Sequence, residues 1–529
     1  MRLLPNYLPV HSSPKAGNGG SNPLTIQQRH HLTAARTDED DIQALAKGGR
    51  TNVFGFVLRL AARMPFLFIA GRLYGPEALG RFAYALLIVE FAAQLASLGL
   101  RRGLAELLSK GDRPQTHIIA DALLAAMAAS ALGAAFFIAL PQLMFPNSGI
   151  TGLDRFLPLA IFAIVATDIA LSALAYKFDI VSSVRARAVV EPWTISIAAG
   201  VFYFYSARDG LILAYVASLV AALFFALWPL WRSYGAPRGW RPSLTRSLGI
   251  AQRNLPLAAA DAAEWGSRRL DLAILGLFAS PAVVGIYYVA QQVASLPQKL
   301  KSSFDPILGP VITRNLQTRN YAEIAKQVGQ VGFWIIAAQA GIALALGIPG
   351  EAVMGLIGPE FVGGTGALAF LLAAEVAAAK AVVSEAALVY MARHRNLLIS
   401  IGMLVVQALV SVGLIQLAKD LPVKPEYVGL YQAAAVACGL MISLGIGSLV
   451  KLKFLSQLLG KKIRVLRWAL LAAVAAGALL GMAFVSLPAR FEWVELMVGV
   501  PAILGLYGWI IWRWGFGAED RVLFRKKRD

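Results

Sequence analysis

Long apolar segments alternate with short polar connections along nearly the whole chain. A transmembrane helix needs about 20 apolar residues, because each residue advances it by about 1.5 Å across a hydrocarbon layer about 30 Å thick. Fourteen segments meet this requirement, at about 53–73, 79–100, 117–140, 156–176, 187–206, 210–231, 255–278, 282–305, 328–349, 364–390, 396–418, 427–450, 466–487 and 493–513. The pattern predicts an all-α, polytopic membrane protein with two pseudo-symmetric six-helix bundles and two additional C-terminal helices.

The composition supports this fold class. The chain is 58% hydrophobic and 15% charged, whereas soluble domains carry about 25% charged residues. The net charge of +19 would favour nucleic acid as the partner of a soluble protein. Here most Lys and Arg residues lie between apolar segments, so we read them as topology signals and expect no nucleic-acid partner.

The basic residues also predict the orientation in the membrane. Alternate connections collect most of them, at about 101–113, 177–187, 232–253, 299–326, 393–395 and 451–467. The other connections hold only Arg72, Arg81, Arg155, Arg208, Lys419, Lys424 and Arg490. Because Lys and Arg accumulate on the cytoplasmic side, both termini are expected in the cytoplasm of a bacterium, with the chain in its inner membrane.

A stretch near the start of the apolar region is repeated in the middle of the chain. When residues 59–86 are shifted by 205 positions, Gly71 falls on Gly276, Pro76 on Pro281 and Gly80 on Gly285. Arg63 likewise falls on Arg268. Six predicted spans separate the copies, so the repeats are parallel and related by an axis along the membrane normal, an architecture that places substrate sites between the repeats.

Four arginines in or near these two spans are the candidate substrate-binding residues. Charges inside a membrane are costly and usually functional. Arg63 lies near the middle of the first span, Arg268 and Arg269 lie at the equivalent depth of the seventh, and Arg59 lies nearer the cytoplasmic edge. The alternative for the seventh span is local pairing with Glu264, four residues before Arg268, or with Asp271, three residues after it.

Carboxylates inside the spans are candidates for coupling to a proton or a sodium ion, since buried acids with raised pKa values can exchange protons. Glu90, Asp261 and Glu264 are the leading candidates. The others are Asp168, Asp271, Glu375 and Glu385. Each is also a partner that an arginine could pair with.

The remaining segments carry no chemistry that the sequence identifies. Residues 1–50 are rich in polar residues, glycine and proline and read as a disordered cytoplasmic tail. The predicted division is residues 51–235 for the first bundle, 250–455 for the second, 465–515 for the additional helices and 516–529 for a basic tail. The only cysteine is Cys438, and no metal-ligand or nucleophile spacing stands out, so we expect no cofactor, no metal and no catalytic residue.

Several stretches resemble the bacterial polysaccharide flippases, the Wzx-like branch of the MOP exporter superfamily. They are residues 47–100, 268–297, 302–314 and 356–372. The resemblance implies two bundles that open alternately to either side and move a polyprenyl-pyrophosphate-linked oligosaccharide outwards between leaflets. It also implies that Arg63 and Arg268 hold the pyrophosphate. Fourteen spans make the chain similar to lipid II flippases as well, so the lipid and the sugar stay open.

Two other classes are weighed against a flippase. A multidrug or small-molecule exporter of the same superfamily would have a cavity dominated by carboxylates rather than arginines. A polysaccharide polymerase or ligase would need a large periplasmic loop for catalysis, and every predicted periplasmic connection is short. The protein is therefore expected not to be an enzyme.

Overall fold

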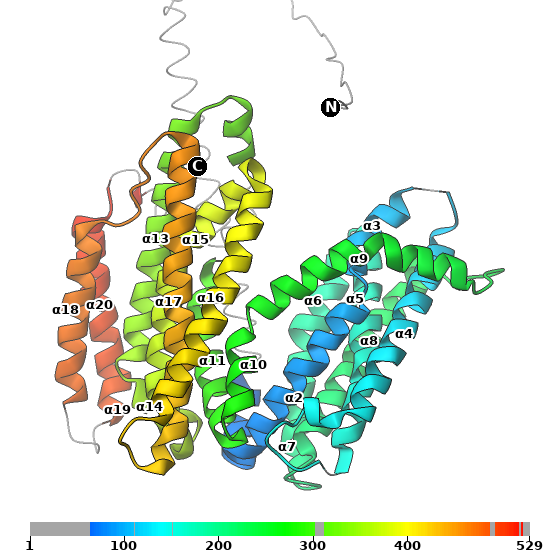
Figure 1. The fold of residues 1–529 in the computed structure, drawn as a ribbon, viewed down its shortest axis with the longest axis horizontal. Coiled ribbons are helices and arrows are strands. Elements are labelled where there is room, and N and C mark those ends of the chain that lie inside the picture. Colours follow the sequence, from blue (N-terminus) through cyan, green and yellow to red (C-terminus); the bar gives the residue numbers. More distant parts are fainter. Residues whose placement is uncertain are drawn as a thin grey trace, which may run out of the picture.

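The computed structural model describes residues 64–110, 112–150, 152–301, 312–486, 492–517 and 520–521. All regular elements in these ranges are helical, as the hydrophobic pattern predicts. The predicted tail (1–50), Arg59 and Arg63 lie outside the described residues. In Figure 1 the helices form two groups that meet at the lower end of the view and diverge toward the upper end.

The first bundle contains the helices up to α8. After the segment Ala70–Tyr74 (η1), it comprises α2 (Gly75–Ala96), α3 (Leu100–Ser109), α4 (Gln115–Ala139), η2 (Pro141–Leu143), η3 (Gly152–Leu159), α5 (Ala160–Tyr176), α6 (Ile180–Val184), η4 (Arg185–Val190), α7 (Glu191–Tyr203) and α8 (Gly210–Tyr234). Helix α5 packs on α2, α4 and α8, and α7 packs on α8. Helix α9 (Leu244–Ser267) lies against α2, α3 and α4 of the same bundle.

The second bundle runs from α10 to α17. It comprises α10 (Leu270–Phe278), α11 (Pro281–Lys301), α13 (Tyr321–Gly347), α14 (Gly350–Ile357), η5 (Pro359–Gly364), α15 (Thr365–Met391), α16 (Arg393–Lys419) and α17 (Pro425–Leu459). Helix α17 packs on α15 and α16, and α11 packs on α13 and α15.

Two further helical segments follow the second bundle. They are α18 (Trp468–Val485) and the segment formed by α19 (Glu492–Val494), η7 (Glu495–Gly499), α20 (Val500–Ile510) and η8 (Ile511–Gly515). Helices α18 and α20 pack on each other and on α13. This is the predicted arrangement of two bundles plus an additional pair.

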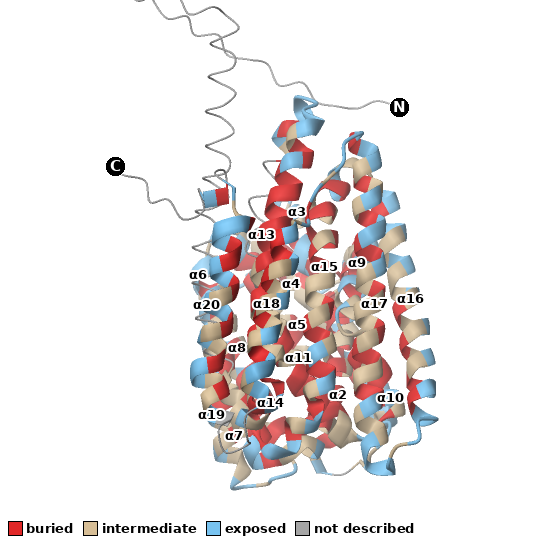
Figure 2. Cartoon of the chain, turned by 90° about the vertical axis from the view of Figure 1, so that its left-hand side faces the viewer, coloured by how far each residue is buried: buried red, intermediate tan, exposed pale blue. Residues whose placement is uncertain are grey.

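Ten helices within the described residues are long and apolar enough to cross a membrane. The predicted count of fourteen stays a prediction, because some spans are interrupted or more polar than those ten. The outer surface suits a lipid environment: α16 exposes Leu397, Leu398, Val405 and Leu409. Figure 2 shows that buried residues gather where helices face each other, while exposed residues lie on the outer faces.

Two predicted spans need correction. The span predicted at 187–206 begins earlier, because α6, η4 and α7 follow one another from Ile180 to Tyr203. Arg185 and Arg187 therefore lie within helical segments, not in a connection. The span predicted at 255–278 is two helices, α9 and α10, which are separated by Arg268 and Arg269.

The connections define two ends of the molecule. One end, here called the basic end, carries the connections Lys177–Asp179, Gly235–Ser243 and Gly460–Arg467 and lies toward the top of Figure 1. The opposite end carries the connections after α4, α7 and α16. The two bundles touch each other near the opposite end.

The repeated glycines make that contact possible. A Cβ atom at Gly80 would lie 1.8 Å from the carbonyl oxygen of Pro281, and a Cβ atom at Gly285 would lie 2.0 Å from that of Pro76. Each glycine also faces the backbone nitrogen of the other. Helices α2 and α11 therefore cross through equivalent residues, which confirms the repeat at these positions.

Candidate functional site

The seventh span breaks at the two arginines that the sequence singled out. Arg268 follows the last residue of α9, and Arg269, with φ −133° and ψ 7°, precedes the first residue of α10. The backbone amide of Arg269 donates to the carbonyl of Gly266, closing a tight turn. Because α9 packs on the first bundle and α10 on α11, α16 and α17, the break lies where the chain passes from one bundle to the other.

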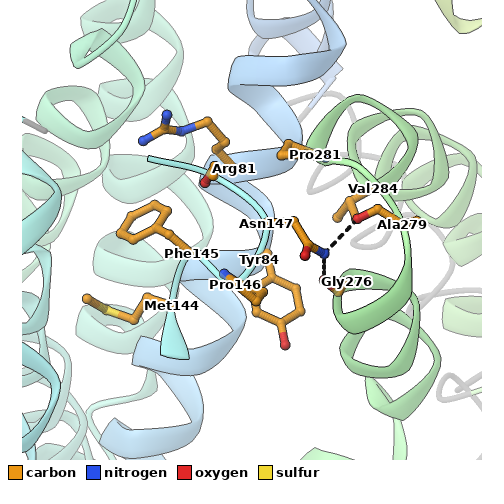
Figure 3. A pocket seen from close by; sticks show the side chains of 12 residues that line it. Arg81, Tyr84, Met144, Phe145, Pro146, Asn147, Gly276, Ala279, Pro281 and Val284 are labelled. Atoms are coloured by element: carbon orange, nitrogen blue, oxygen red, sulfur yellow. Dashed lines mark hydrogen bonds between the residues drawn. The ribbon is translucent and has the colours of Figure 1, made fainter. Parts of the chain in front are cut away.

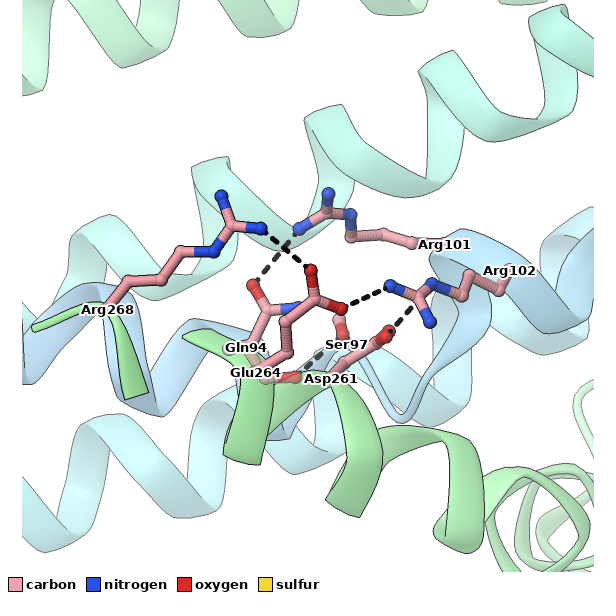
Figure 4. Close-up of polar contacts among 7 residues, drawn as sticks. All are labelled: Gln94, Ser97, Arg101, Arg102, Asp261, Glu264 and Arg268. Atoms are coloured by element: carbon pink, nitrogen blue, oxygen red, sulfur yellow. Dashed lines mark hydrogen bonds and ion pairs between the residues drawn. The ribbon is translucent and has the colours of Figure 1, made fainter. Parts of the chain in front are cut away.

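Arg268 lies in an ion-pair cluster on the α9 side of the break (Figure 4). Its Nη2 donates to Oε1 of Glu264 at 3.0 Å, and Nη2 of Arg102 donates to Oε2 of the same carboxylate at 2.8 Å. Nε of Arg102 lies 3.1 Å from Oδ1 of Asp261, which is buried. Arg101 extends over this cluster and donates to Gln94. Two arginines thus share one half-exposed carboxylate, and a third lies beside them.

Arg269 points to a different partner. Its Nη2 lies 3.4 Å from Oε2 of Glu90 on α2, and its guanidinium lies over the ring of Trp265, 5.1 Å from the centroid. Arg269 and Glu90 line a cavity of about 170 Å³, together with Glu191, Tyr215, Tyr288 and Gln292. Elements of both bundles form its walls, because Tyr288 and Gln292 belong to α11.

A second ion-pair network lies beside this cavity, and the sequence reasoning missed it. Nη2 of Arg187 lies 2.5 Å from Oδ1 of Asp168, and its Nη1 lies 2.7 Å from Oε2 of Glu191. Helix α6 carries a recognisable start signal, since the carboxylate of Asp179 accepts from the backbone amide of Ser182. That cap could have shown that the helix begins before Arg187.

The predicted residues therefore divide into groups. Arg268, Glu264 and Asp261 come together through Arg102, and the local pairing of Arg268 with Glu264 that we left open is observed. Arg269 and Glu90 form their own pair. The other predicted alternative, a pair between Arg268 and Asp271, is wrong: Asp271 accepts from Tyr287 at 2.7 Å and from Gln291 at 2.9 Å.

Chemically, the break favours an anion. The dipole of α10 favours negative charge at its first turn. The backbone amides of Asp271 and Leu272 there donate to the carboxylate of Asp271. Arginine adds a fixed fork of donors that matches phosphate oxygens. The neighbouring carboxylates are hydrogen-bonded or paired in this state, so an arriving anion would compete with Glu264 and Glu90 for the same guanidinium groups.

Solved structures of known transporters share this fold. A structure described as the lipid II flippase MurJ in an inward closed conformation aligns with a TM-score of 0.61 at 12% identity, over 87% of this chain and 99% of that one. An inward-facing multidrug resistance MATE family transporter of the MOP superfamily aligns with a TM-score of 0.56 at 16% identity, over 79% and 94% of the two chains. A MATE structure in a straight conformation aligns with a TM-score of 0.51 at 14% identity, over 80% and 96%.

Sequence comparison identifies the family. None of the curated proteins matches the chain significantly. The model of the family described as "Polysaccharide biosynthesis protein" matches residues 69–334, which is half of the 529 residues and includes both copies of the glycine motif and the break between α9 and α10. The chain therefore belongs to the polysaccharide biosynthesis protein family, and it has the fold of the MOP superfamily transporters.

Proposed function

We propose that this protein flips a polyprenyl-pyrophosphate-linked oligosaccharide from the cytoplasmic to the periplasmic leaflet of the bacterial inner membrane, for polysaccharide or lipopolysaccharide biosynthesis. The basic end faces the cytoplasm, and transport proceeds by alternating access between the two bundles. Its substrate and the surrounding membrane lipids are its partners, and the protein is a transporter rather than an enzyme.

The observation that carries this proposal is the break in the seventh span. A pyrophosphate diester brings about two negative charges, which hydrocarbon excludes. At the break, the N-terminal end of α10 and the guanidinium of Arg269 lie beside a cavity lined by both bundles. This arrangement gives the head group a polar route while the polyprenyl chain stays in the lipid.

The ion-pair cluster supplies a first contact on that route. Arg268 and Arg102 are more than half exposed and share Glu264. Because that carboxylate is itself half exposed, a phosphate can replace it without burying an unpaired charge. Arg63 and Arg59 complete the proposed set of substrate-binding arginines on the first span.

We assign ion coupling to the carboxylates that form ion pairs with these arginines, namely Glu90, Asp261 and Glu264. Release of Arg269 from Glu90, or of Arg102 from Asp261 and Glu264, leaves a carboxylate whose charge must be balanced. A proton or a sodium ion supplies that balance when the empty carrier returns.

Export of multidrug or other small molecules is the second candidate function, and one observation favours it. The cavity beside Arg269 is lined by two carboxylates, Glu90 and Glu191. Both lie within an ion pair with an arginine, Glu90 with Arg269 and Glu191 with Arg187. We favour the anionic substrate because these pairs leave little net negative charge to attract a cation.

Reconstituted vesicles test the proposal. Arg269→Ala should lower the rate of flipping of a fluorescent polyprenyl-pyrophosphate-linked sugar at least tenfold, because the charge-assisted contact to the phosphate is lost. Arg269→Lys should retain more activity, because it keeps the charge. Arg232→Ala is the control, since Arg232 is an exposed arginine near the basic end. Normal flipping by Arg269→Ala, or export of organic cations that the variant abolishes, would overturn the proposal.

A further inference from the structure

The connection after α4 reaches from the first bundle to the second at the end opposite the basic end. In Figure 3 the side chain of Asn147 points at the last turn of α10. Its Nδ2 donates to the carbonyl oxygen of Gly276 at 2.8 Å and to that of Ala279 at 2.9 Å. These are carbonyls that the end of a helix leaves without partners in the helix. One amide group of the first bundle thus caps a helix of the second.

The loop that presents Asn147 is fixed to its own bundle. Met144 and Phe145 are fully buried. Arg81 of α2 lies over the Phe145 ring, 5.4 Å from its centroid, and pairs with Asp154 at 2.6 Å. The position of Asn147 therefore follows the first bundle, while the position of its acceptors follows the second.

The contact lies beside the close crossing of the repeats. Gly80, Pro281 and Gly276 border a space of only about 20 Å³ next to Asn147, which has room for about one water molecule. The bundles cannot separate at this end while both hydrogen bonds persist. Asn147 itself is exposed, so water can satisfy its amide and both carbonyls once the bundles part, and the cost of breaking the contact is small.

We propose that Asn147 is a reversible latch that holds the opposite end closed while the basic end is open. Because it caps the C-terminal end of α10, it also holds the short helix that Arg269 precedes at the other end. Rearrangement at the break and release of the latch are thus coupled through nine residues of helix. The alternation between two open states rests on the proposed function, but the closure of this end does not.

Thiol labelling tests the latch without any substrate. In a background with Cys438→Ala, the reporters are Val284→Cys, which is buried beside the latch, and Ser295→Cys, which lines the cavity toward the basic end. Asn147→Asp removes the donor and keeps the shape. Asn147→Ala removes the side chain. Ser148→Ala is the control, because Ser148 lines the same space and, within the described residues, its side chain makes no hydrogen bond to α10.

With an impermeant maleimide, Asn147→Asp should raise the labelling rate at Val284→Cys about tenfold and lower the rate at Ser295→Cys. A tenfold change is what we expect when the closed state loses the two hydrogen bonds of Asn147 and the open state loses none. Asn147→Ala should give the same pattern and Ser148→Ala should not. Unchanged labelling at Val284→Cys would overturn the latch. So would a rise at both reporters, since that indicates local unfolding instead of a shift between states. Failure of the proposed substrate would change the flipping assay and leave this labelling pattern intact.

Discussion

At the scale of single residues, Glu264 decides how strongly the break attracts an anion. It accepts hydrogen bonds from Arg102 of α3 and from Arg268 at the end of α9. A carboxylate shared by two guanidinium groups occupies the position that a phosphate would take. In the empty protein it balances their charge, and it must yield when the substrate binds.

Replacing Glu264 should therefore tighten binding of a pyrophosphate lipid. We expect Glu264→Gln to lower the dissociation constant for undecaprenyl pyrophosphate about three- to tenfold, because removing one nearby negative charge is worth about 1 kcal/mol in a partly hydrated site. Binding to the purified protein in detergent, followed by native mass spectrometry, measures the change. Glu106→Gln is the matched control. Glu106 of α3 pairs with Arg253 of α9, so it is also a carboxylate between these two helices, but it lies away from the break. Equal effects of both variants would show that only the overall charge matters.

The sequence identified part of this site and missed part of it. Arg268 and Arg269 were visible because arginine is rare in an apolar span. Arg102 and Arg187 were assigned to connections, since the basic residues around them are typical of loops on the cytoplasmic side. What pairs them with Glu264 and Asp168 is packing between different helices, across 162 residues for Arg102 and 19 for Arg187. One sequence offers no signal for that.

At the scale of the elements, the crossing of α2 and α11 depends on the absence of two side chains. Gly80 and Gly285 each face the backbone of the partner helix at distances that no Cβ atom tolerates. In a membrane, where lipid is as apolar as a helix surface, such close backbone approach is a main source of helix association.

Adding a methyl group at either glycine should loosen this crossing. Gly80→Ala and Gly285→Ala should each lower the melting temperature in detergent, with a loss of about 1–3 kcal/mol, because the helices must move apart. Gly413→Ala on α16 meets no atom within 4 Å, so it should leave stability unchanged or raise it slightly through helix propensity. If all three variants behave alike, the close approach does not contribute to stability.

Hydrophobic periodicity placed most helices within a few residues of their observed ends, as for α4, α8 and α16. It did not reveal the break between α9 and α10. Polar residues interrupt the predicted span, but no proline lies between Gly266 and Arg269 to mark a break. The turn is held instead by contacts of each half with a different bundle, which only the assembled fold supplies.

At the scale of the whole molecule, the two ends differ in what joins the bundles. At the opposite end, the glycine crossing and Asn147 hold them together. A further hydrogen bond joins Arg72 of η1 to the carbonyl oxygen of Leu356 in α14 at 2.9 Å. Toward the basic end the bundles diverge (Figure 1). With the basic end in the cytoplasm, as proposed, this is a state that receives substrate from the inside.

The membrane potential then bears on the direction of transport. If the arginines stay in the cavity wall and no cation travels with the head group, about two negative charges move outwards from the negative cell interior. Each charge gains about 2.3 kcal/mol per 100 mV, so the step is downhill by about 4 to 5 kcal/mol.

In proteoliposomes, a potassium diffusion potential that is negative on the starting side should speed the appearance of the pyrophosphate-linked sugar on the other side. A monophosphate-linked sugar carries half the charge. The logarithm of its flipping rate should therefore change about half as much for the same change in membrane potential. Vesicles without protein control for leakage under the same potential. Flipping that ignores the potential and stops when a proton gradient is collapsed would contradict this account, and it would assign the driving force to protonation of Glu90 or Asp261.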